Sequence, residues 1–537
     1  MPATTSSNGS PSSKRNARGA AGTRKGRGAL PVRSVVPALA IALVLAALSA
    51  SAIAFFYLRG YLLYYGDAVS HINIARRIVD SRTPGLGQIG TVWLPLPHLL
   101  MLPLVWDKHL WMTGLAGAIP AGICFVIAGL FVFLATRRVF NDGAAAVAAT
   151  LMMTLNPNLL YLASIPMTEP VFLACLAALL YFTVRFRETQ GRGALVGAAL
   201  AAAAGSLARY EGWFVIPFAA LYFLIAARGK RRAAVLTFSI IASLGPLAWL
   251  AHNLFYYGNA FEFYNGAASA KAIYQHALDA GMTKYPGDHD WRKAAEYLAA
   301  AIRLCVAWPL VILGAAGAAI ALARRALWPL LLLSLVPVFY LWSLHSGSTP
   351  VFVPHLWPNS FYNTRYGLSA LPLVAFAAAA LVTIAPAGLR KQAAVIVVLL
   401  SVCPWLAYPR PEAWICWKES QVNSEARRDW THQAAEYMRA NYHRGDGILT
   451  PVGDVSGIYQ EVGIPLAETF NECNWPAWER MANSPNPAPS EKWAVAISGD
   501  KVADLVMRAG RPGPRYDLLK TISVKGAPVI EIYHRQP

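Results

Sequence analysis

Eleven long apolar runs, separated by short polar connections, constrain the fold of this chain of 537 residues more than any other feature. A run of about 20 apolar residues crosses lipid as a helix, because every peptide group must then be hydrogen-bonded within the segment. The runs lie at 35–58, 111–135, 144–162, 170–184, 193–208, 212–227, 233–254, 304–322, 327–345, 366–385 and 392–408. Only 14% of the residues are charged, against about 25% in soluble proteins. The sequence therefore predicts a multi-pass α-helical membrane protein with about eleven transmembrane helices.

Basic residues mark one side of the predicted membrane. They cluster in every second connection between apolar runs: Arg137–Arg138, 185–192, 228–232, Arg324–Arg325 and Arg390–Lys391. Basic loops favour the cytoplasmic side, so we expect a cytoplasmic N-terminus and, with eleven helices, an outer C-terminus. The net charge is +19, but it lies in these short clusters and not in one stripe. We therefore expect no nucleic-acid partner.

Composition divides the chain into three parts. Residues 1–33 are basic and rich in Ser, Gly and Ala, which predicts a disordered cytoplasmic segment. Residues 34–408 hold the apolar runs and form the predicted transmembrane domain. Residues 409–537 alternate helical patterns with short β-rich runs, which is typical of an α/β domain outside the membrane. The helical patterns are at 425–441 and 501–509, and the β-rich runs are at 447–451, 493–498 and 529–533.

Three cysteines lie at or beyond the predicted outer end of the last run. Cys416 and Cys473 belong to the outer domain and would meet an oxidising compartment, where they could pair. Cys403, near the outer end of the last helix, is a rival partner. The sequence leaves both pairings open.

The connections on the outer side collect the residues suited to chemistry. They belong to segments hundreds of residues apart, which a plain structural bundle would not require. They are Asp67, His71, His98, Glu169, Arg209, Glu211, Glu262, His345, His355 and Arg365.

The first outer connection holds a carboxylate and an imidazole one helical turn apart. A helix from Asp67 would place Asp67, Ser70 and His71 on a polar stripe, as in a helix lying on a bilayer surface. Its apolar stripe would be Ala68, Ile72, Ala75 and Val79. Asp67 is either a helix N-cap or a general base, and His71 is either a surface residue or its partner. Trp93 and His98 lie in a Pro-rich stretch that forms either a kinked interfacial segment or a pocket wall.

Two acids and two arginines stand at the outer ends of later helices. Glu169, in a turn between Pro166 and Pro170, is either a helix cap or a second acid facing a cavity. Arg209 and Glu211 either neutralise one another and anchor the interface, or Arg209 binds a lipid phosphate. Arg365, followed by Tyr366, offers the same contact from another helix.

These residues and their order resemble the GT-C superfamily of membrane glycosyltransferases, in particular bacterial aminoarabinose transferases and protein O-mannosyltransferases. The resemblance covers roughly 60–410 and rests on loose motifs. In chain order these are Asp67 opening a helix that ends in ARRI at Ile78, the Pro-rich 93–97 stretch, the TEP turn at 168–170, Arg209 before Gly212 and Pro217, and the Arg365–Tyr366 pair.

The resemblance implies an inverting transferase that moves a sugar from a polyprenyl phosphate to an acceptor at the outer face. It places the protein in a bacterial inner membrane, with the C-terminal domain in the periplasm, and leaves a lipid, glycan or protein as acceptor. By resemblance, Asp67 is the base or supports the acceptor, Glu169 is a second acid, and Arg209 and Arg365 bind phosphate. Many relatives have a second acid after the first, but Ala68 follows here, so a divalent metal stays open.

The interpretation has two rivals of another class. A lipid or glycan flippase should repeat its hydropathy pattern in two halves, and no such repeat is visible. A non-catalytic assembly protein would leave Asp67, Glu169 and Arg365 without a purpose. From the sequence we assign Asp67, Glu169 and His71 to catalysis, and Arg209, Glu211, Arg365, Tyr366, Trp93 and His98 to substrate binding.

Overall fold

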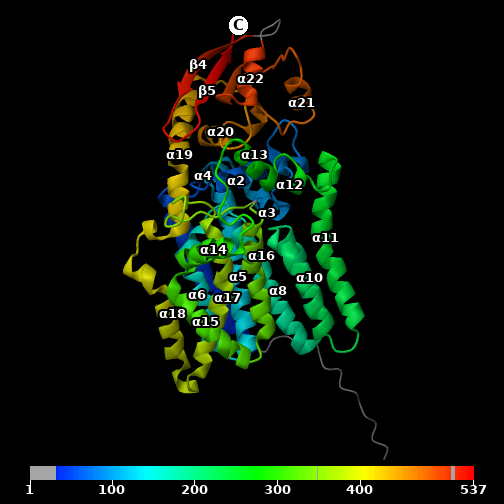
Figure 1. Cartoon of the computed structure of the whole chain (residues 1–537), viewed down its shortest axis with the longest axis vertical. Coiled ribbons are helices and arrows are strands. Elements are labelled where there is room, and N and C mark those ends of the chain that lie inside the picture. Colours follow the sequence, from blue (N-terminus) through cyan, green and yellow to red (C-terminus); the bar gives the residue numbers. More distant parts are fainter. Residues whose placement is uncertain (1–31, 348, 510–514, 537) are drawn as a thin grey trace, which may run out of the picture.

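The computed structural model of the chain describes residues 32–347, 349–509 and 515–536. Long helices form a bundle at one end, shorter helices form a middle layer, and an α/β unit closes the other end (Figure 1). Of the segment predicted to be disordered, residues 1–31 lie outside the described residues.

The bundle is built from the apolar runs. Its helices are α1 (Val32–Leu58), α5 (Leu115–Phe140), α6 (Gly143–Thr154), α8 (Glu169–Thr189), α9 (Arg192–Ser206), α10 (Glu211–Ala226), α11 (Arg231–Tyr257), α15 (Trp308–Ala323), α16 (Leu327–His345), α17 (Leu371–Ala379) and α18 (Arg390–Ala407). The 3₁₀ turns η2 (Thr364–Ala370), η3 (Ala380–Ile384) and η4 (Ala387–Leu389) flank α17 and α18.

Seven helical segments of the described residues are long and apolar enough to cross a membrane. An eighth forms if α14 (Trp291–Val306) and α15, which bend by 105° at their junction, count as one span. The predicted runs at 144–162, 193–208 and 212–227 fold into the shorter helices α6, α9 and α10. The multi-pass helical architecture is therefore confirmed, and the number eleven stays a prediction.

One face of α11 is suited to lipid. Leu236, Ile240, Leu244 and Leu247 are all more than half exposed, and their spacing places them on one side of the helix. A contiguous exposed apolar face of this kind is typical of contact with hydrocarbon chains.

Small residues set the contact between α1 and α5. A Cβ atom at Gly122 would lie 2.6 Å from Ser49 Oγ, and one at Gly129 would lie 2.6 Å from Leu45 Cδ1. Seven residues separate these glycines, so both face α1 and let the two backbones approach closely. This contact fixes where the chain leaves α1 and enters the first outer connection.

The middle layer carries that connection and lies between the bundle and the α/β unit (Figure 1). Its elements are α2 (Gly66–Val79), η1 (Leu86–Ile89), α3 (Pro95–Val105), α4 (Lys108–Thr113), α7 (Pro157–Leu162), α12 (Glu262–Asn265), α13 (Ala270–Asp279), α14 and η5 (Pro411–Ala413).

Helix α2 does not lie on a bilayer surface as the sequence predicted. Ile72 and Ala75 pack in the core of the α/β unit, whereas Ile74 and Ile78 pack against Trp249 of α11. His71, on the face predicted to be polar and open, is 1% exposed. His98 of α3 and Trp93 cover the face that carries His71, whereas the α/β unit covers the predicted apolar stripe at Ile72 and Ala75.

The α/β unit contains a mixed sheet with strand order β2-β1-β3-β5-β4. β1 pairs parallel with β2 and β3, and β5 pairs antiparallel with β3 and β4. Its elements are α19 (Ile415–Asn441), β1 (Ile448–Leu449), α20 (Ser456–Val462), η6 (Leu466–Glu468), β2 (Thr469–Phe470), α21 (Ala477–Ala482), β3 (Trp493–Ile497), α22 (Lys501–Arg508), β4 (Tyr516–Ile522) and β5 (Ile530–Arg535). The helices and strands predicted beyond residue 409 are thus confirmed in kind.

Strand β3 is buried on both of its faces, whereas β4 at the edge of the sheet is mostly exposed. The side chains of β3 alternate between two cores. Trp493 and Val495 face α19, whereas Ala494 and Ala496 face α22. This alternation follows from the two-residue period of a strand. The sheet therefore holds α19 in place, and α19 reaches from the α/β unit down to the bundle (Figure 1).

Candidate active site

Five charged side chains from separate parts of the chain form one row of alternating sign. Arg365 Nη2 lies 2.5 Å from Asp67 Oδ2, and Arg365 Nε lies 3.0 Å from Glu169 Oε1. Arg209 continues the row, with Nη1 2.9 Å from Glu169 Oε1 and Nε 2.7 Å from Glu211 Oε1. The row brings together the acids and arginines that the sequence singled out on four outer connections.

The three acids stand at the beginnings of three helices. Asp67, Glu169 and Glu211 lie in the first turns of α2, α8 and α10. The positive end of a helix dipole favours a negative charge at this position. The cap alternatives are wrong, because the N-cap residues of α2 and α8 are Tyr65 and Thr168. The carboxylates of Asp67 and Glu169 are instead engaged by arginines.

Arg365 is the most connected member of the row. Its Nη1 lies 3.7 Å from Glu419 Oε1, so three carboxylates surround one guanidinium. Glu419, on α19, also accepts the backbone N–H groups of Asn363 and Thr364 at 3.0 and 2.8 Å. The guanidinium carbon lies 5.3 and 5.5 Å from the ring centroids of Tyr65 and Tyr366. Arg365 is therefore held from several sides, as a charge-binding group must be if its position matters.

Tyr340 of α16 completes the second half of the row. Arg209 Nη2 donates to its hydroxyl at 2.7 Å, and the hydroxyl donates to Glu211. Arg209 Nη1 also donates to Thr168 Oγ1 at 2.6 Å. The suggestion that Arg209 and Glu211 neutralise one another is confirmed. The contact with Glu169 and the position beside the cavity described below go beyond simple anchoring.

Sequence reasoning missed Tyr340, Tyr65 and Glu419. Tyr340 lies within an apolar run, where a single tyrosine is ordinary. Glu419 follows the last run and falls in the stretch assigned to the outer domain. The one available signal was an acid close after a transmembrane helix, which is the same signal that marked Asp67.

A buried pair of imidazoles adjoins the row. His71 Nδ1 and His98 Nε2 lie 2.9 Å apart, and the edge of the Trp93 ring system meets His71 with centroids 4.2 Å apart. Burial lowers the pKa of His71 well below its ordinary value, and His98 adds to the effect. Burial likewise lowers the pKa of His98 to about 3. Both imidazoles are therefore neutral, and the alternative that His71 is a surface residue is wrong.

A narrow apolar cavity opens at the two arginines. Arg209, Arg365, Glu169, Glu211 and Tyr366 line its head. The rest of its wall comes from α7, α8, α16, η2 and α17: Leu159, Phe172, Leu173, Leu176, Val336, Tyr340, Leu368, Ser369, Leu371 and Pro372. We call it the apolar cavity. Two arginines and two glutamates thus lie at the head of an apolar hollow of about 50 Å³.

Other predicted residues lie elsewhere. Glu262 accepts a hydrogen bond from Asn259 on the outer side of α12. His345 stacks on Trp291 with centroids 3.9 Å apart, and His355 is exposed. None of the three joins the charged row. The loop pattern predicts the same membrane side for all three and for the row, but they do not belong to the row.

Among the described residues, neither of the two cysteine pairings that the sequence left open is present. Cys416 is buried and its sulfur lies 3.9 Å from that of Cys305, not beside Cys473 or Cys403. The reason is that α19 starts against the bundle, so Cys416 faces α14. The backbone carbonyl of Cys473 instead accepts Gln88 Nε2 in the connection after α2.

The described residues hold no group of three or more His, Cys, Asp or Glu side chains placed to bind a metal ion. Asp67 and Glu169 are spanned by Arg365 instead.

Together these features define a multi-pass membrane protein with a charged site at one end of its helix bundle. Residues 111–256 match the sequence model of a family described as dolichyl-phosphate-mannose-protein mannosyltransferase. No curated protein sequence matches the chain.

Solved structures are similar over most of the chain. The structure of ArnT from Cupriavidus metallidurans bound to undecaprenyl phosphate has a TM-score of 0.51 at 13% identity, covering 94% of this chain and 98% of ArnT. The apo oligosaccharyltransferase of Archaeoglobus fulgidus has a TM-score of 0.44 at 13% identity, covering 86% and 69%. The family match and the ArnT-like fold confirm the resemblance to GT-C superfamily glycosyltransferases.

Proposed function

We propose that this protein is an inverting glycosyltransferase that moves a sugar from a polyprenyl phosphate to an acceptor on the outer side of a membrane. The observation that carries the proposal is the 2.5 Å contact between Asp67 and Arg365. It joins a carboxylate suited to a general base to a cation that lines the apolar cavity. A base and a phosphate-binding group side by side are what this transfer requires.

The donor would lie in the apolar cavity with its phosphate at Arg209 and Arg365. Guanidinium groups bind phosphate oxygens in a bidentate manner, and both arginines are already oriented by carboxylates. The isoprenoid chain would follow the apolar wall between α8, α16 and α17. The undecaprenyl phosphate bound to ArnT, which shares the fold, supports a lipid of this class.

The transfer proceeds by direct displacement. The acceptor hydroxyl oxygen attacks the anomeric carbon while the bond from that carbon to the phosphate oxygen breaks. The hydroxyl proton passes to Asp67, and the electron pair of the broken bond leaves on the lipid phosphate. Arg365 and Arg209 stabilise the added charge on that phosphate, which is where a preorganised cation contributes most.

The remaining predicted residues would have supporting roles. Glu169 bridges the two arginines and fixes their separation, and Glu211 holds Arg209 from its other side. Tyr366 presents its ring to both guanidinium groups. The neutral His71, with His98 and Trp93 behind it, would border the sugar and help to orient it.

The orientation and the division of the chain belong to the same proposal. Eleven spans, an N-terminus in the cytoplasm and a C-terminal domain in the periplasm would place the charged row on the periplasmic side of a bacterial inner membrane. Residues 34–408 would form the membrane domain and 409–537 the outer domain. A lipid, a glycan or a protein could accept the sugar in this scheme.

The test is release of polyprenyl phosphate from candidate polyprenyl-phosphate sugars by the purified full-length protein in detergent. We expect release by the wild type and a loss of about 10²–10⁴-fold for Asp67→Asn, the usual contribution of a general base. Asp279→Asn, an exposed carboxylate on α13, is the control and should retain the rate. Wild-type release by Asp67→Asn would overturn the assignment. Absence of release by the wild type, with the lipid moved across vesicles instead, would favour a flippase.

A further inference from the structure

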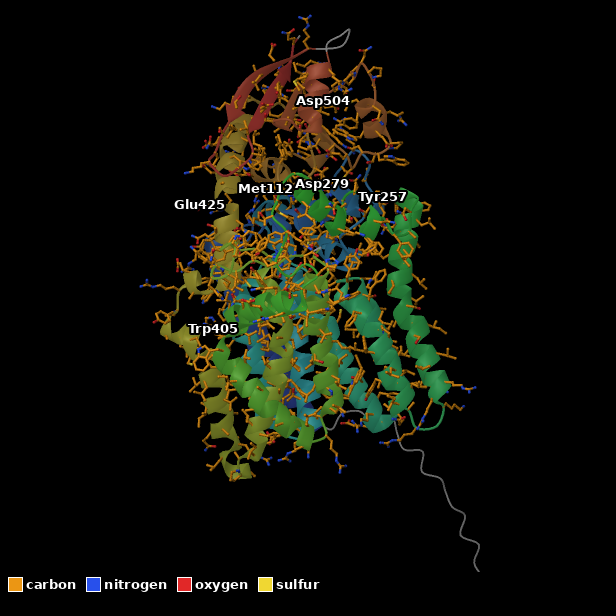
Figure 2. The ribbon with its side chains drawn as sticks, in the orientation of Figure 1. Met112, Tyr257, Asp279, Trp405, Glu425 and Asp504 are labelled. Carbon is orange, nitrogen blue, oxygen red and sulfur yellow. The ribbon has the colours of Figure 1, made fainter. Side chains whose placement is uncertain are left out.

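A second hollow lies where the connection before α2 meets the α/β unit. It has a volume of about 600 Å³ and is lined by the connection around Tyr64, by the start of α2, and by α4, α19 and α20. We call it the polar cleft. Met112 of α4 and Glu425 of α19, both labelled in Figure 2, belong to its lining. Its volume is in the range of sites for small ligands or for a short stretch of a longer one.

Residues close in sequence to the proposed base line the polar cleft. Tyr64 and Val69, which flank Asp67 in sequence, both line it. Arg427 also lines it, donates to the backbone carbonyl of Tyr64 at 2.7 Å, and lies within electrostatic reach of Asp67. The Asp67 side chain is 32% exposed, whereas that of Arg365 is 9% exposed. Asp67 thus contacts Arg365, which lines the apolar cavity, and precedes by two residues Val69, which lines the polar cleft.

Opposite charges are mixed along the cleft wall. Arg427 and Arg428 face it together with Glu425, Asp429 and Glu461. His432 also faces it, and its hydrogen bond with Glu461 raises the pKa of this imidazole. A polyanion would meet three carboxylates here, and a polycation would meet two arginines. The lining favours a ligand that carries no net charge.

The groups of the cleft are also suited to hydroxyls. Arg428 Nε donates to Ser424 Oγ at 3.0 Å, and its guanidinium carbon lies 3.9 Å from the Tyr64 ring centroid. Arg428 is therefore held in place and keeps N–H groups that can donate to a ligand. Glu425 and Asp429 offer carboxylate acceptors on an exposed face of α19. A hydroxyl both donates and accepts, so fixed donors beside acceptors match a chain of hydroxyl groups.

We propose that the polar cleft binds the acceptor of the transfer and that this acceptor is an uncharged glycan. The inference rests on the proposed function and deepens it by assigning the acceptor side. It also gives the α/β unit a task, because α19 and α20 supply most of the cleft wall. A glycan hydroxyl at the Asp67 end of the cleft would face a sugar held at the head of the apolar cavity.

The test compares binding of two ligands by the purified full-length protein in detergent. The probes are maltohexaose, as an uncharged hexasaccharide, and undecaprenyl phosphate. In Gly457→Leu a side chain would fill the cleft, since a Cβ there would meet Thr431 and Val69 at 3.5 and 3.9 Å without a clash. We expect Gly457→Leu to weaken maltohexaose binding at least about tenfold and to leave undecaprenyl phosphate binding unchanged.

A second variant guards against misfolding. Glu425→Gln combined with Asp429→Asn removes two exposed acceptors from the cleft and should weaken maltohexaose binding about five- to tenfold, as loss of charge-assisted hydrogen bonds does. Asp504→Asn, an exposed carboxylate of α22 far from the cleft (Figure 2), is the matched control and should have no effect.

Each outcome decides the proposal separately from the proposed function. Absence of maltohexaose binding to the wild type, or equal binding by the cleft variants, overturns the glycan site even where polyprenyl phosphate is released from the donor. A Ser/Thr-rich peptide or a phosphatidylglycerol vesicle that binds the wild type and is lost in Gly457→Leu, in place of maltohexaose, also overturns it. Absence of donor turnover overturns the proposed function, whereas the binding comparison still decides what the cleft holds.

Discussion

Arg365 and Asp67 are 298 residues apart in sequence, yet their side chains meet at 2.5 Å. The contact joins the turn before α17 to the first turn of α2, so it links the late and early parts of the bundle. Glu169 at 3.0 Å and Glu419 at 3.7 Å place two more carboxylates around the same guanidinium. One cation thus holds three acids from three other segments, and its replacement should affect the fold and the chemistry differently according to the substitute.

Arg365→Gln removes the positive charge, so three carboxylates lose their cationic partner. We expect the folded state to lose about 3–5 kcal/mol, the usual cost of breaking a buried ion pair. Arg365→Lys keeps the charge, but one ammonium cannot replace a planar fork with three contacts. This variant should fold and lose about 10²-fold in donor turnover. Thermal unfolding in detergent and polyprenyl phosphate release measure the two effects. Arg292→Lys, an exposed site on α14, is the control, and wild-type turnover by Arg365→Lys would contradict the role.

Tyr340→Phe tests the support of Arg209. The hydroxyl accepts from Arg209 Nη2 at 2.7 Å and donates to Glu211, so its loss leaves two buried groups short of a partner. We expect a loss of about 1–3 kcal/mol in stability and weaker binding of undecaprenyl phosphate. Tyr222→Phe removes a comparable bond to the Thr183 carbonyl, away from the charged row. It should destabilise without changing lipid binding, and an equal change in both variants would deny Tyr340 a special role.

The sequence predicted the members of the site better than their surroundings. Asp67, Glu169, Arg209 and Arg365 each stand out because a charge at the end of an apolar run is expensive and needs a reason. The basic loops predicted that these four residues share one side of the membrane. Their pairing depends on helix packing, because each arginine could have met any acid on that side. Glu262, on the same side, shows that a shared side does not amount to a shared site.

The environment of α2 could not be inferred from its own pattern. Asp67, Ser70 and His71 form a polar stripe in sequence, yet His71 is buried against His98. Whether a polar stripe faces water depends on what covers it, and His98 and Trp93, from the Pro-rich stretch after α2, cover His71. The contact of Glu419 with Arg365 was missed because it depends on how α19 packs against the turn that carries Arg365.

Asn73 provides a test of how α2 packs against the α/β unit. Its Nδ2 donates to Gln460 Oε1 at 3.0 Å, its Oδ1 accepts Trp111 Nε1 at 2.9 Å, and Gln460 Nε2 donates to the Trp111 carbonyl at 2.8 Å. Asn73→Leu would leave two of these buried groups unpaired, and we expect a loss of about 3 kcal/mol with faster proteolysis at the junction of α2 and α20. Asn441→Leu, at an exposed position of α19, should resist the protease like the wild type. Equal protection of Asn73→Leu would contradict this account.

The imidazole pair predicts how stability depends on pH. Burial lowers the pKa of both His71 and His98 in the folded protein, for His98 to about 3, whereas an unfolded imidazole titrates near 6.5. Between these values the unfolded chain binds more protons, so the stability is present above about pH 6.5 and is lost as the pH falls below it. Each imidazole should contribute a loss of about 2 kcal/mol between pH 7 and pH 5, seen as a fall of the thermal midpoint in detergent.

The double variant His71→Gln with His98→Gln should be less stable at pH 7 but should lose much of this slope, whereas the exposed His276→Gln should keep it. A wild type equally stable at pH 7 and pH 5 would show that the pair is protonated in the folded protein, and the assignment of two neutral imidazoles beside the arginines would be wrong.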